Sequence, residues 1–158
     1  MRKNLLLVSL AACGAVAFSS SVALAGDNWL GTWKLNVAKS EYSPGPTPKS
    51  LTLKFERTEG GVKLTSDGVD AGGKATHAEY VSKFDGMDVQ WAGNPDADTA
   101  SAKKIDDNSY ENVWKKGGKT TITAKAVVSE DGKTLTVNLN GTNAKGQTVN
   151  NAAVYDRQ

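Results

Sequence analysis

Cysteine and histidine are almost missing from this sequence, which contains one of each, Cys13 and His77. Thiolate metal sites and multi-histidine metal sites need these residues in sets, so one chain cannot assemble either kind. Period-two alternation places His77 on one strand face with Glu79 and Lys83, which predicts a solvated residue. The sequence therefore predicts no metal site and no cofactor.

An excess of charge of one sign is also lacking. Arg2 and Lys3 are the only charged residues among the first 25, so the rest of the chain has 17 basic residues (19 − 2) and 17 acidic ones. Proteins that bind a nucleic acid backbone typically carry a basic patch and a net positive charge. The balance argues against nucleic acid as a partner.

Residues 1–25 have the features of a bacterial signal peptide. Arg2 and Lys3 precede an apolar run, and Ala23-Leu24-Ala25 offers the small residues that a signal peptidase cleaves after. We therefore expect cleavage near Ala25 and a mature protein in the periplasm or secreted from the cell.

A second interpretation of the same segment remains open. Leu10-Ala11-Ala12-Cys13 resembles the cleavage box of bacterial lipoproteins, which would leave a lipid anchor on Cys13. We favour it less because Cys13 comes early and the apolar run continues past it to Phe18. In both cases we expect residues 26–158 to form a single domain without a membrane span.

Apolar residues at helical spacing are missing after residue 25, and period-two alternation takes their place. Leu51-Leu53-Phe55, for example, alternate with Thr52-Lys54-Glu56. Turn-forming pairs such as Gly60-Gly61 and Asp131-Gly132 separate the alternating segments. The pattern predicts strands near residues 29–36, 50–57, 62–67, 75–84, 87–92, 99–106, 109–116, 119–129, 133–142 and 147–157. Because most connections are hairpin-short, we expect an all-β fold, an antiparallel up-and-down barrel of about 8–10 strands.

One connection, from Val37 to Ser50, is long and rich in proline. Proline is excluded from helix interiors and central strands, so this segment is predicted to be an extended surface loop. Two roles are open for it: a plain linker, or a flap over a barrel mouth with Tyr42, Pro44 and Pro46 as its contacts.

Gly31-Thr32-Trp33 resembles the opening strand of the calycins, the lipocalins and fatty-acid-binding proteins. In that superfamily the tryptophan closes one end of the barrel and a basic residue of the last strand lies across its ring. The resemblance implies that Arg157 plays this part, and a guanidinium over an indole gains about 0.5–2 kcal/mol. The chain also resembles small exported bacterial proteins of unassigned function.

Two features depart from the fatty-acid-binding pattern. The proline-rich loop stands where that group has a helical pair between its first two strands. That group also binds the ligand carboxylate with an arginine two residues before the tyrosine of the final strand. Tyr155 matches the tyrosine, but the position of the arginine is Ala153.

Strand parity identifies a set of aromatic and polar side chains that point inward. They are Tyr80, Phe84, Trp91, Tyr110, Asn112, Trp114 and Tyr155. A packed core and the wall of an apolar cavity are both consistent with them. Small inward residues (Ala78, Ala100, Ala102, Ala124 and Ala126) favour an empty interior, because ten strands enclose a wide space.

Two further motifs have alternative interpretations. Arg57 shares parity with inward residues and is a candidate for the barrel mouth, where it would meet an anionic group, although a solvated rim position is the simpler alternative. Asn94, Asp96 and Asp98 have the spacing that begins some calcium loops, but the glycine and the closing glutamate are missing. They predict a polar turn.

These patterns predict an exported protein that binds or carries a small apolar molecule, with no catalytic residues. The alternative is a non-enzymatic inhibitor or envelope protein that has a filled barrel and works through its surface. An enzyme ranks last, because a nucleophile with its base, a metal set and paired buried acids are all missing from the readable pattern.

Overall fold

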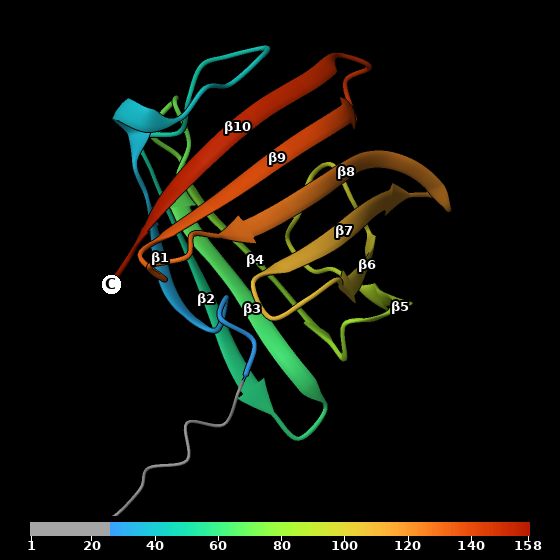
Figure 1. Cartoon of the computed structure of the whole chain (residues 1–158). Coiled ribbons are helices and arrows are strands. Elements are labelled where there is room, and N and C mark those ends of the chain that lie inside the picture. The colour runs from blue at the N-terminus through green and yellow to red at the C-terminus, as the bar shows by residue number, and fades with distance from the viewer. Residues whose placement is uncertain (1–25) are drawn as a thin grey trace, which may run out of the picture.

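The computed structural model describes residues 26–158, which form one antiparallel sheet and a single 3₁₀ turn, η1 (Val37–Lys39) (Figure 1). The strands are β1 (Gly31–Leu35), β2 (Ser50–Thr58), β3 (Gly61–Val69), β4 (Ala75–Ser82), β5 (Asp85–Gln90), β6 (Thr99–Lys104), β7 (Ser109–Lys116), β8 (Lys119–Val128), β9 (Thr134–Thr142) and β10 (Thr148–Arg157). All ten predicted strands are therefore confirmed. The predicted signal segment, including Cys13, lies outside the described residues.

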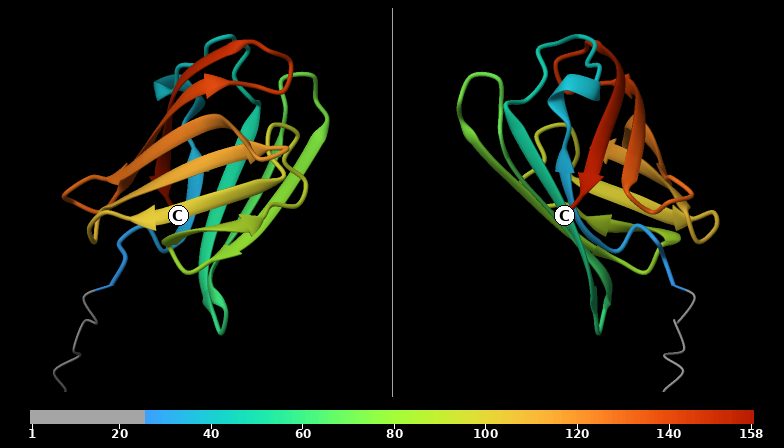
Figure 2. Two further views of the ribbon diagram at one scale, coloured as in Figure 1. Left: turned by 90° about the vertical axis from the view of Figure 1, so that its right-hand side faces the viewer. Right: turned by 60° about the vertical axis from the view of Figure 1, so that its left-hand side comes forward.

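Backbone hydrogen bonds order the strands β4-β3-β2-β1-β10-β9-β8-β7-β6-β5. Neighbours in this order are antiparallel and consecutive in the chain, except that the last strand pairs with the first. In that pair Trp33 lies opposite Arg157. The sheet curls around one interior, as the views in Figure 2 show. This is the calycin-like meander barrel that the sequence predicts.

The barrel is not fully closed, because its two edge strands, β4 and β5, do not form a continuous ladder. Two backbone hydrogen bonds of 3.0 Å between Glu79 and Ala92 bridge the edges. Phe84, in the turn between the strands, has φ 57°, and the register of β5 shifts between Asp85 and Asp88. A bulge of this kind bends the bulged strand. The turn at Phe84 and the register shift both lie where the chain leaves β4 and enters β5, the point at which the two strands separate.

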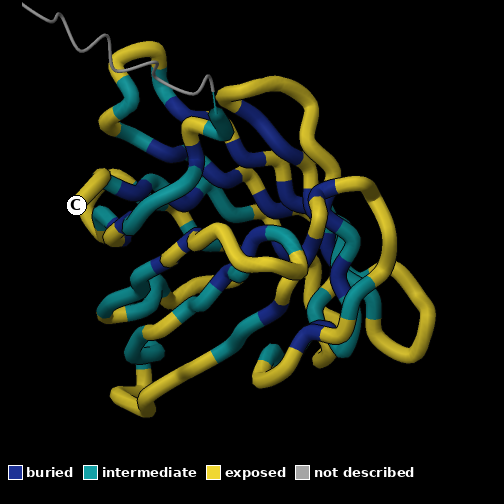
Figure 3. The backbone as a smooth tube through the Cα atoms, turned by 90° about the horizontal axis from the view of Figure 1, so that it is seen from below, coloured by how far each residue is buried: buried dark blue, intermediate teal, exposed yellow. Residues whose placement is uncertain are grey.

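Burial alternates along the strands, so that each strand gives one set of side chains to the interior (Figure 3). Four of the predicted inward alanines are at most 3% exposed: Ala100, Ala102, Ala124 and Ala126. Ala78 is half-buried. Such small side chains do not reach the centre of a barrel of this width.

Trp33 and Arg157 close one end of the barrel, as the resemblance implies. The Trp33 ring is fully buried, and its Nε1–H donates to the Trp29 carbonyl oxygen at 2.7 Å. The Arg157 guanidinium lies 4.1 Å from the centre of the Trp33 ring and donates to the Leu30 carbonyl oxygen at 3.0 Å. Gly31 has φ 117°, and a Cβ there would lie 3.1 Å from the guanidinium, so a larger residue would crowd this contact. The N-terminal and C-terminal strands are thereby joined.

Behind this pair, four aromatic rings fill the same end of the barrel. Trp29 lies 5.7 Å from Phe84 and 5.4 Å from Tyr110, measured between ring centroids. Tyr110 also packs against Phe55 at 5.8 Å. Edge-on and offset aromatic pairs at these distances each contribute about 0.5–1.5 kcal/mol beyond burial. This end is therefore a packed core.

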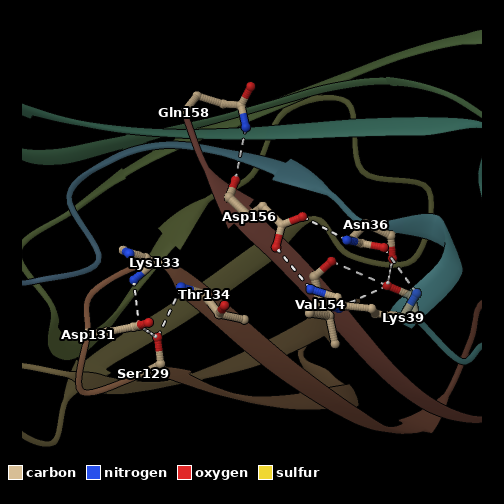
Figure 4. A network of polar contacts seen from close by, with 10 residues as sticks. Asn36, Lys39, Ser129, Asp131, Lys133, Thr134, Val154, Asp156 and Gln158 are labelled. Atoms are coloured by element: carbon tan, nitrogen blue, oxygen red, sulfur yellow. Dashed lines mark hydrogen bonds and ion pairs between the residues drawn. The ribbon is translucent and has the colours of Figure 1, made fainter.

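The start of the proline-rich loop is fastened to β10 (Figure 4). Asn36 Nδ2 donates to the Asp156 carboxylate at 2.7 Å, and the Lys39 ammonium lies 3.7 Å from the same carboxylate. The Ser40 hydroxyl accepts a hydrogen bond from the Val154 backbone N–H at 2.9 Å. These contacts direct the loop toward the other end of the barrel.

Candidate functional site

A cavity of about 440 Å³ lies inside the barrel and opens at the end opposite the Trp33–Arg157 pair. Ligand pockets for small molecules typically have volumes of about 300–1,000 Å³. Much of the wall is aliphatic and comes from inward positions of β2, β3, β8 and β9: Leu51, Leu53, Leu64, Ile122, Val137 and Leu139. The interior is thus an apolar compartment that the protein's own side chains do not fill.

The proline-rich loop forms part of the mouth of this cavity. Glu41 pairs with Ala152 of β10, and the Ser43 backbone N–H donates to the Asn151 side chain at 2.9 Å. Between these two anchors Tyr42 turns inward, lines the cavity and shares a side-chain hydrogen bond with Tyr155. The structure thus places Tyr42 at the mouth, as the flap interpretation expects.

Two of the loop's prolines, Pro44 and Pro48, also line the mouth. Pro46, which was predicted to do so, is not among the lining residues. In Figure 1 the loop lies at the same end of the barrel as the β9–β10 hairpin. Because backbone and side-chain contacts to β10 hold the loop, it is a fixed part of the rim.

The opposite side of the rim is the turn between β5 and β6. Asn94 Oδ1 accepts the Asp96 backbone N–H at 2.9 Å, so the predicted polar turn is present. The Asp96 carboxylate in turn accepts the Ala144 backbone N–H, also at 2.9 Å, from the β9–β10 turn. This hydrogen bond joins two rim segments that are distant in sequence.

The deeper wall contains the aromatic and polar side chains that parity predicts. Asn112 and Trp114 both line the cavity from β7, and Trp91 lies beside Trp114 with ring centroids 4.8 Å apart. Asn112 Nδ2 donates to the Tyr80 hydroxyl at 2.9 Å. Tyr110 and Tyr155 line the cavity as well, so five of the seven predicted interior residues are brought together there.

Tyr80 and Phe84 are buried but lie elsewhere. Tyr80 supports the cavity wall through Asn112 and packs edge-on against Trp91, with 5.1 Å between ring centroids. Phe84 belongs to the aromatic core of the closed end, and its prediction as a cavity residue is corrected. Alternation turns Phe84 inward, as it does Tyr80 and Ser82, but it does not show that this end of β4 lies at the packed end of the barrel.

The prediction of Arg57 at the barrel mouth was wrong. Arg57 lies at the closed end, where its guanidinium donates to the Asp27 carboxylate at 2.9 Å. Its side chain is 62% exposed, because it stands at the end of β2 beside the β2–β3 turn. Arg57 therefore has the solvated position of the alternative interpretation, at the closed end of the barrel and beside the Asp27 carboxylate.

His77 lies at the edge of the mouth, on the outer face of β4. Its side chain is 59% exposed, and Nδ1 lies 2.6 Å from the Asp67 carboxylate on β3. Among residues 26–158 there is no group of three His, Cys, Asp or Glu residues that could hold a metal ion. Within the same range, no helix is long and apolar enough to cross a membrane.

Sequence reasoning missed Trp29 and most of the aliphatic wall. Trp29 is only 1% exposed and anchors the closed end, although it stands at the first position of a predicted strand. Alternation predicts that Leu51 and Leu53 point to the same face, but it does not distinguish a cavity wall from a packed core. Whether the interior is empty or filled depends on the volumes of all inward side chains together.

Burial strongly affects the four tyrosines of the chain. It raises the pKa of Tyr80, Tyr110 and Tyr155, and to a lesser extent that of Tyr42, where a hydrogen bond with Tyr155 opposes the shift. A hydrogen bond from Asn112 partly opposes the increase at Tyr80. The cavity wall therefore contains neutral hydroxyl groups at any physiological pH.

We predict an alkaline unfolding transition from these shifts. Each folded-state pKa lies above the unfolded value of about 10, so the folded protein retains protons that the unfolded chain releases, and stability falls as the pH rises above about 10. Phenolate absorbance in the ultraviolet should therefore increase together with the loss of the circular dichroism signal. In denaturant the same absorbance should titrate near pH 10. A phenolate step near pH 10 in protein with an intact dichroism signal would contradict this.

The comparisons with known proteins add little to this description. No protein-family model and no curated protein matches the sequence. Among solved structures, the barrel is similar to a zebrafish ileal bile acid-binding protein in complex with cholic acid, with 9% sequence identity and a TM-score of 0.49. The alignment covers 83% of this chain and 99% of that one. The fold described above rests on the strand order and register of this chain alone.

Proposed function

We propose that this protein is an exported binding or carrier protein for a small apolar molecule, which it holds inside the barrel. The observation that carries the proposal is the cavity: a ten-stranded barrel with a packed closed end leaves about 440 Å³ of apolar-walled space open at the other end. Natural protein interiors are close-packed, so an apolar space of this size inside a barrel is typical of a ligand site.

Three further features support the proposal. Burying apolar surface contributes about 25 cal/mol per Å², so leucine and valine walls favour apolar compounds. The rim is organised by hydrogen bonds between distant segments, such as that from Ala144 to Asp96. The leader at residues 1–25 supports export. The cavity also argues against the alternative function, an inhibitor or envelope protein whose barrel core is filled.

Mass spectrometry of the protein purified from its own host tests both parts of the proposal. Native spectra should show a complex heavier than the polypeptide, and denaturing spectra should show a chain that begins near Gly26. A mass that contains a lipid on Cys13 would instead identify an anchored protein. A clean ligand-free native mass, together with no binding of the neutral dye N-phenylnaphthylamine, would refute the binding function.

A further inference from the structure

The cavity wall contains polar atoms that have no hydrogen-bond partner. Among residues 26–158, four shielded side-chain atoms are unpaired: Trp29 Nε1 in the packed closed end, and Asn112 Oδ1, Trp91 Nε1 and Trp114 Nε1, whose residues line the cavity. Asn112 is 4% exposed and Trp91 is 8% exposed. Buried polar atoms without a partner cost about 1–3 kcal/mol each, so native structures rarely keep them unless another molecule satisfies them.

These three atoms belong to one continuous part of the wall. Asn112 and Trp114 are two residues apart on the inward face of β7, and the Trp91 ring packs edge-on against Trp114 with 4.8 Å between centroids. All three residues line the cavity. We refer to Trp91, Asn112 and Trp114 as the polar patch. It lies beside aliphatic wall residues such as Ile122 and Leu139, so it provides one place for a polar group of a ligand.

The donors and acceptors of the polar patch fit a hydroxyl group. The two indole N–H groups can only donate, and they require an acceptor. The free atom of the Asn112 amide accepts when Nδ2 donates to the Tyr80 hydroxyl at 2.9 Å. Rotating the amide by half a turn would exchange its donor and its acceptor, and one amide atom would still lack a partner. A hydroxyl group satisfies both cases, because it donates and accepts.

Charge excludes the other common polar group of apolar ligands, the carboxylate. Among the described residues that line the cavity there is no lysine and no arginine. The acidic residues at the rim, Asp70 and Asp96, would repel an anion that approaches the mouth. An ionised carboxylate at the polar patch would be buried without a counter-ion, which is costly.

We propose, on the basis of the binding function above, that the ligand is a neutral apolar alcohol whose hydroxyl group is held by the polar patch. The apolar body of the ligand occupies the aliphatic part of the cavity. The hydroxyl supplies the hydrogen-bond partner that Asn112 Oδ1 and the two indole N–H groups lack. An alkane of the same size offers no such partner.

Displacement of bound N-phenylnaphthylamine by two matched probes tests the inference. Decanol carries a hydroxyl group, and in undecane a methyl group replaces it. The quantity of interest is the ratio of the two affinities, compared between the natural protein and Asn112→Leu, because differences in probe solubility cancel. Loss of a buried hydrogen bond predicts that Asn112→Leu lowers the preference for decanol about tenfold. Decanoate at neutral pH should bind at least about tenfold more weakly than decanol to the natural protein.

Two further variants complete the test. Trp114→Phe retains an aromatic ring but removes one N–H, so it should also lower the decanol preference, even if Asn112→Leu fails to fold. Lys125→Ala changes an exposed residue on the outer face of β8 and should leave the ratio unchanged. If both probes bind and the ratio is the same in all variants, or if decanoate binds as tightly as decanol, the alcohol inference is overturned and the binding function stands. If neither the dye nor any probe binds, the binding function itself fails.

Discussion

Replacing Trp33 by alanine should lower the free energy of unfolding by about 3–5 kcal/mol, the range measured for large buried aromatic residues. The Trp33 ring is fully buried, donates to the Trp29 carbonyl oxygen and supports the Arg157 guanidinium. Its removal leaves a void and also removes the contact with the Arg157 guanidinium that joins β1 to β10. Urea denaturation followed by circular dichroism measures the loss.

Trp114→Ala is the matched control, because the same atoms are deleted from a wall that already faces open space. Trp114 is only half-buried and lines the cavity, so its loss enlarges an existing space and leaves the packed core intact. We expect this variant to lose no more than about half as much stability as Trp33→Ala. Equal losses in the two variants would show that the Trp33–Arg157 pair has no special part in closing the barrel.

A phenylalanine at position 124 should abolish ligand binding while the barrel still folds. Ala124 is 3% exposed, lies opposite Asn112 in the β7–β8 ladder and lines the middle of the cavity. The new ring would occupy the space that a ligand needs, and overlap of this kind costs roughly 1–3 kcal/mol, which corresponds to about a 5- to 160-fold loss of affinity. Titration with N-phenylnaphthylamine measures the effect.

Lys125→Phe adds the same ring to the next residue of β8, on the outer face of the sheet. Lys125 is exposed, so this variant should bind the dye with unchanged affinity. Its comparison with Ala124→Phe separates binding inside the barrel from dye adsorption on an aromatic surface. Dye binding that is equally strong in both variants would mean that the dye does not enter the cavity, and the carrier proposal would lose its main support.

The alternating pattern of the sequence was enough to predict the ten strands, because each strand has one buried and one solvated face. The pairing of Trp33 with Arg157 was also predictable, since both residues belong to a motif at the chain ends. Alternation is interrupted where the register of β5 shifts between Asp85 and Asp88, and Met87, in this segment, is 67% exposed although Trp91 of the same parity is buried.

The site was predictable only in part, for a physical reason. Parity identifies which side chains point inward, and five of the seven named residues do line the cavity. It does not measure how far they reach, so it could not decide between a filled and an empty interior. Arg57 was misplaced because it lies at a strand end, where alternation no longer sets the direction of the side chain. Phe84 was misplaced because parity does not show which end of the barrel is packed.

The position of β10 between β1 and β9 has a consequence for the order of folding. The first strand cannot acquire its second neighbour until β10 has been synthesised, and β10 (Thr148–Arg157) is distant in the sequence from β1 (Gly31–Leu35). Contacts between such distant segments carry a large loop-closure cost and slow the folding of β proteins. A nascent chain of this topology therefore keeps one side of β1 unpaired until β10 has left the ribosome.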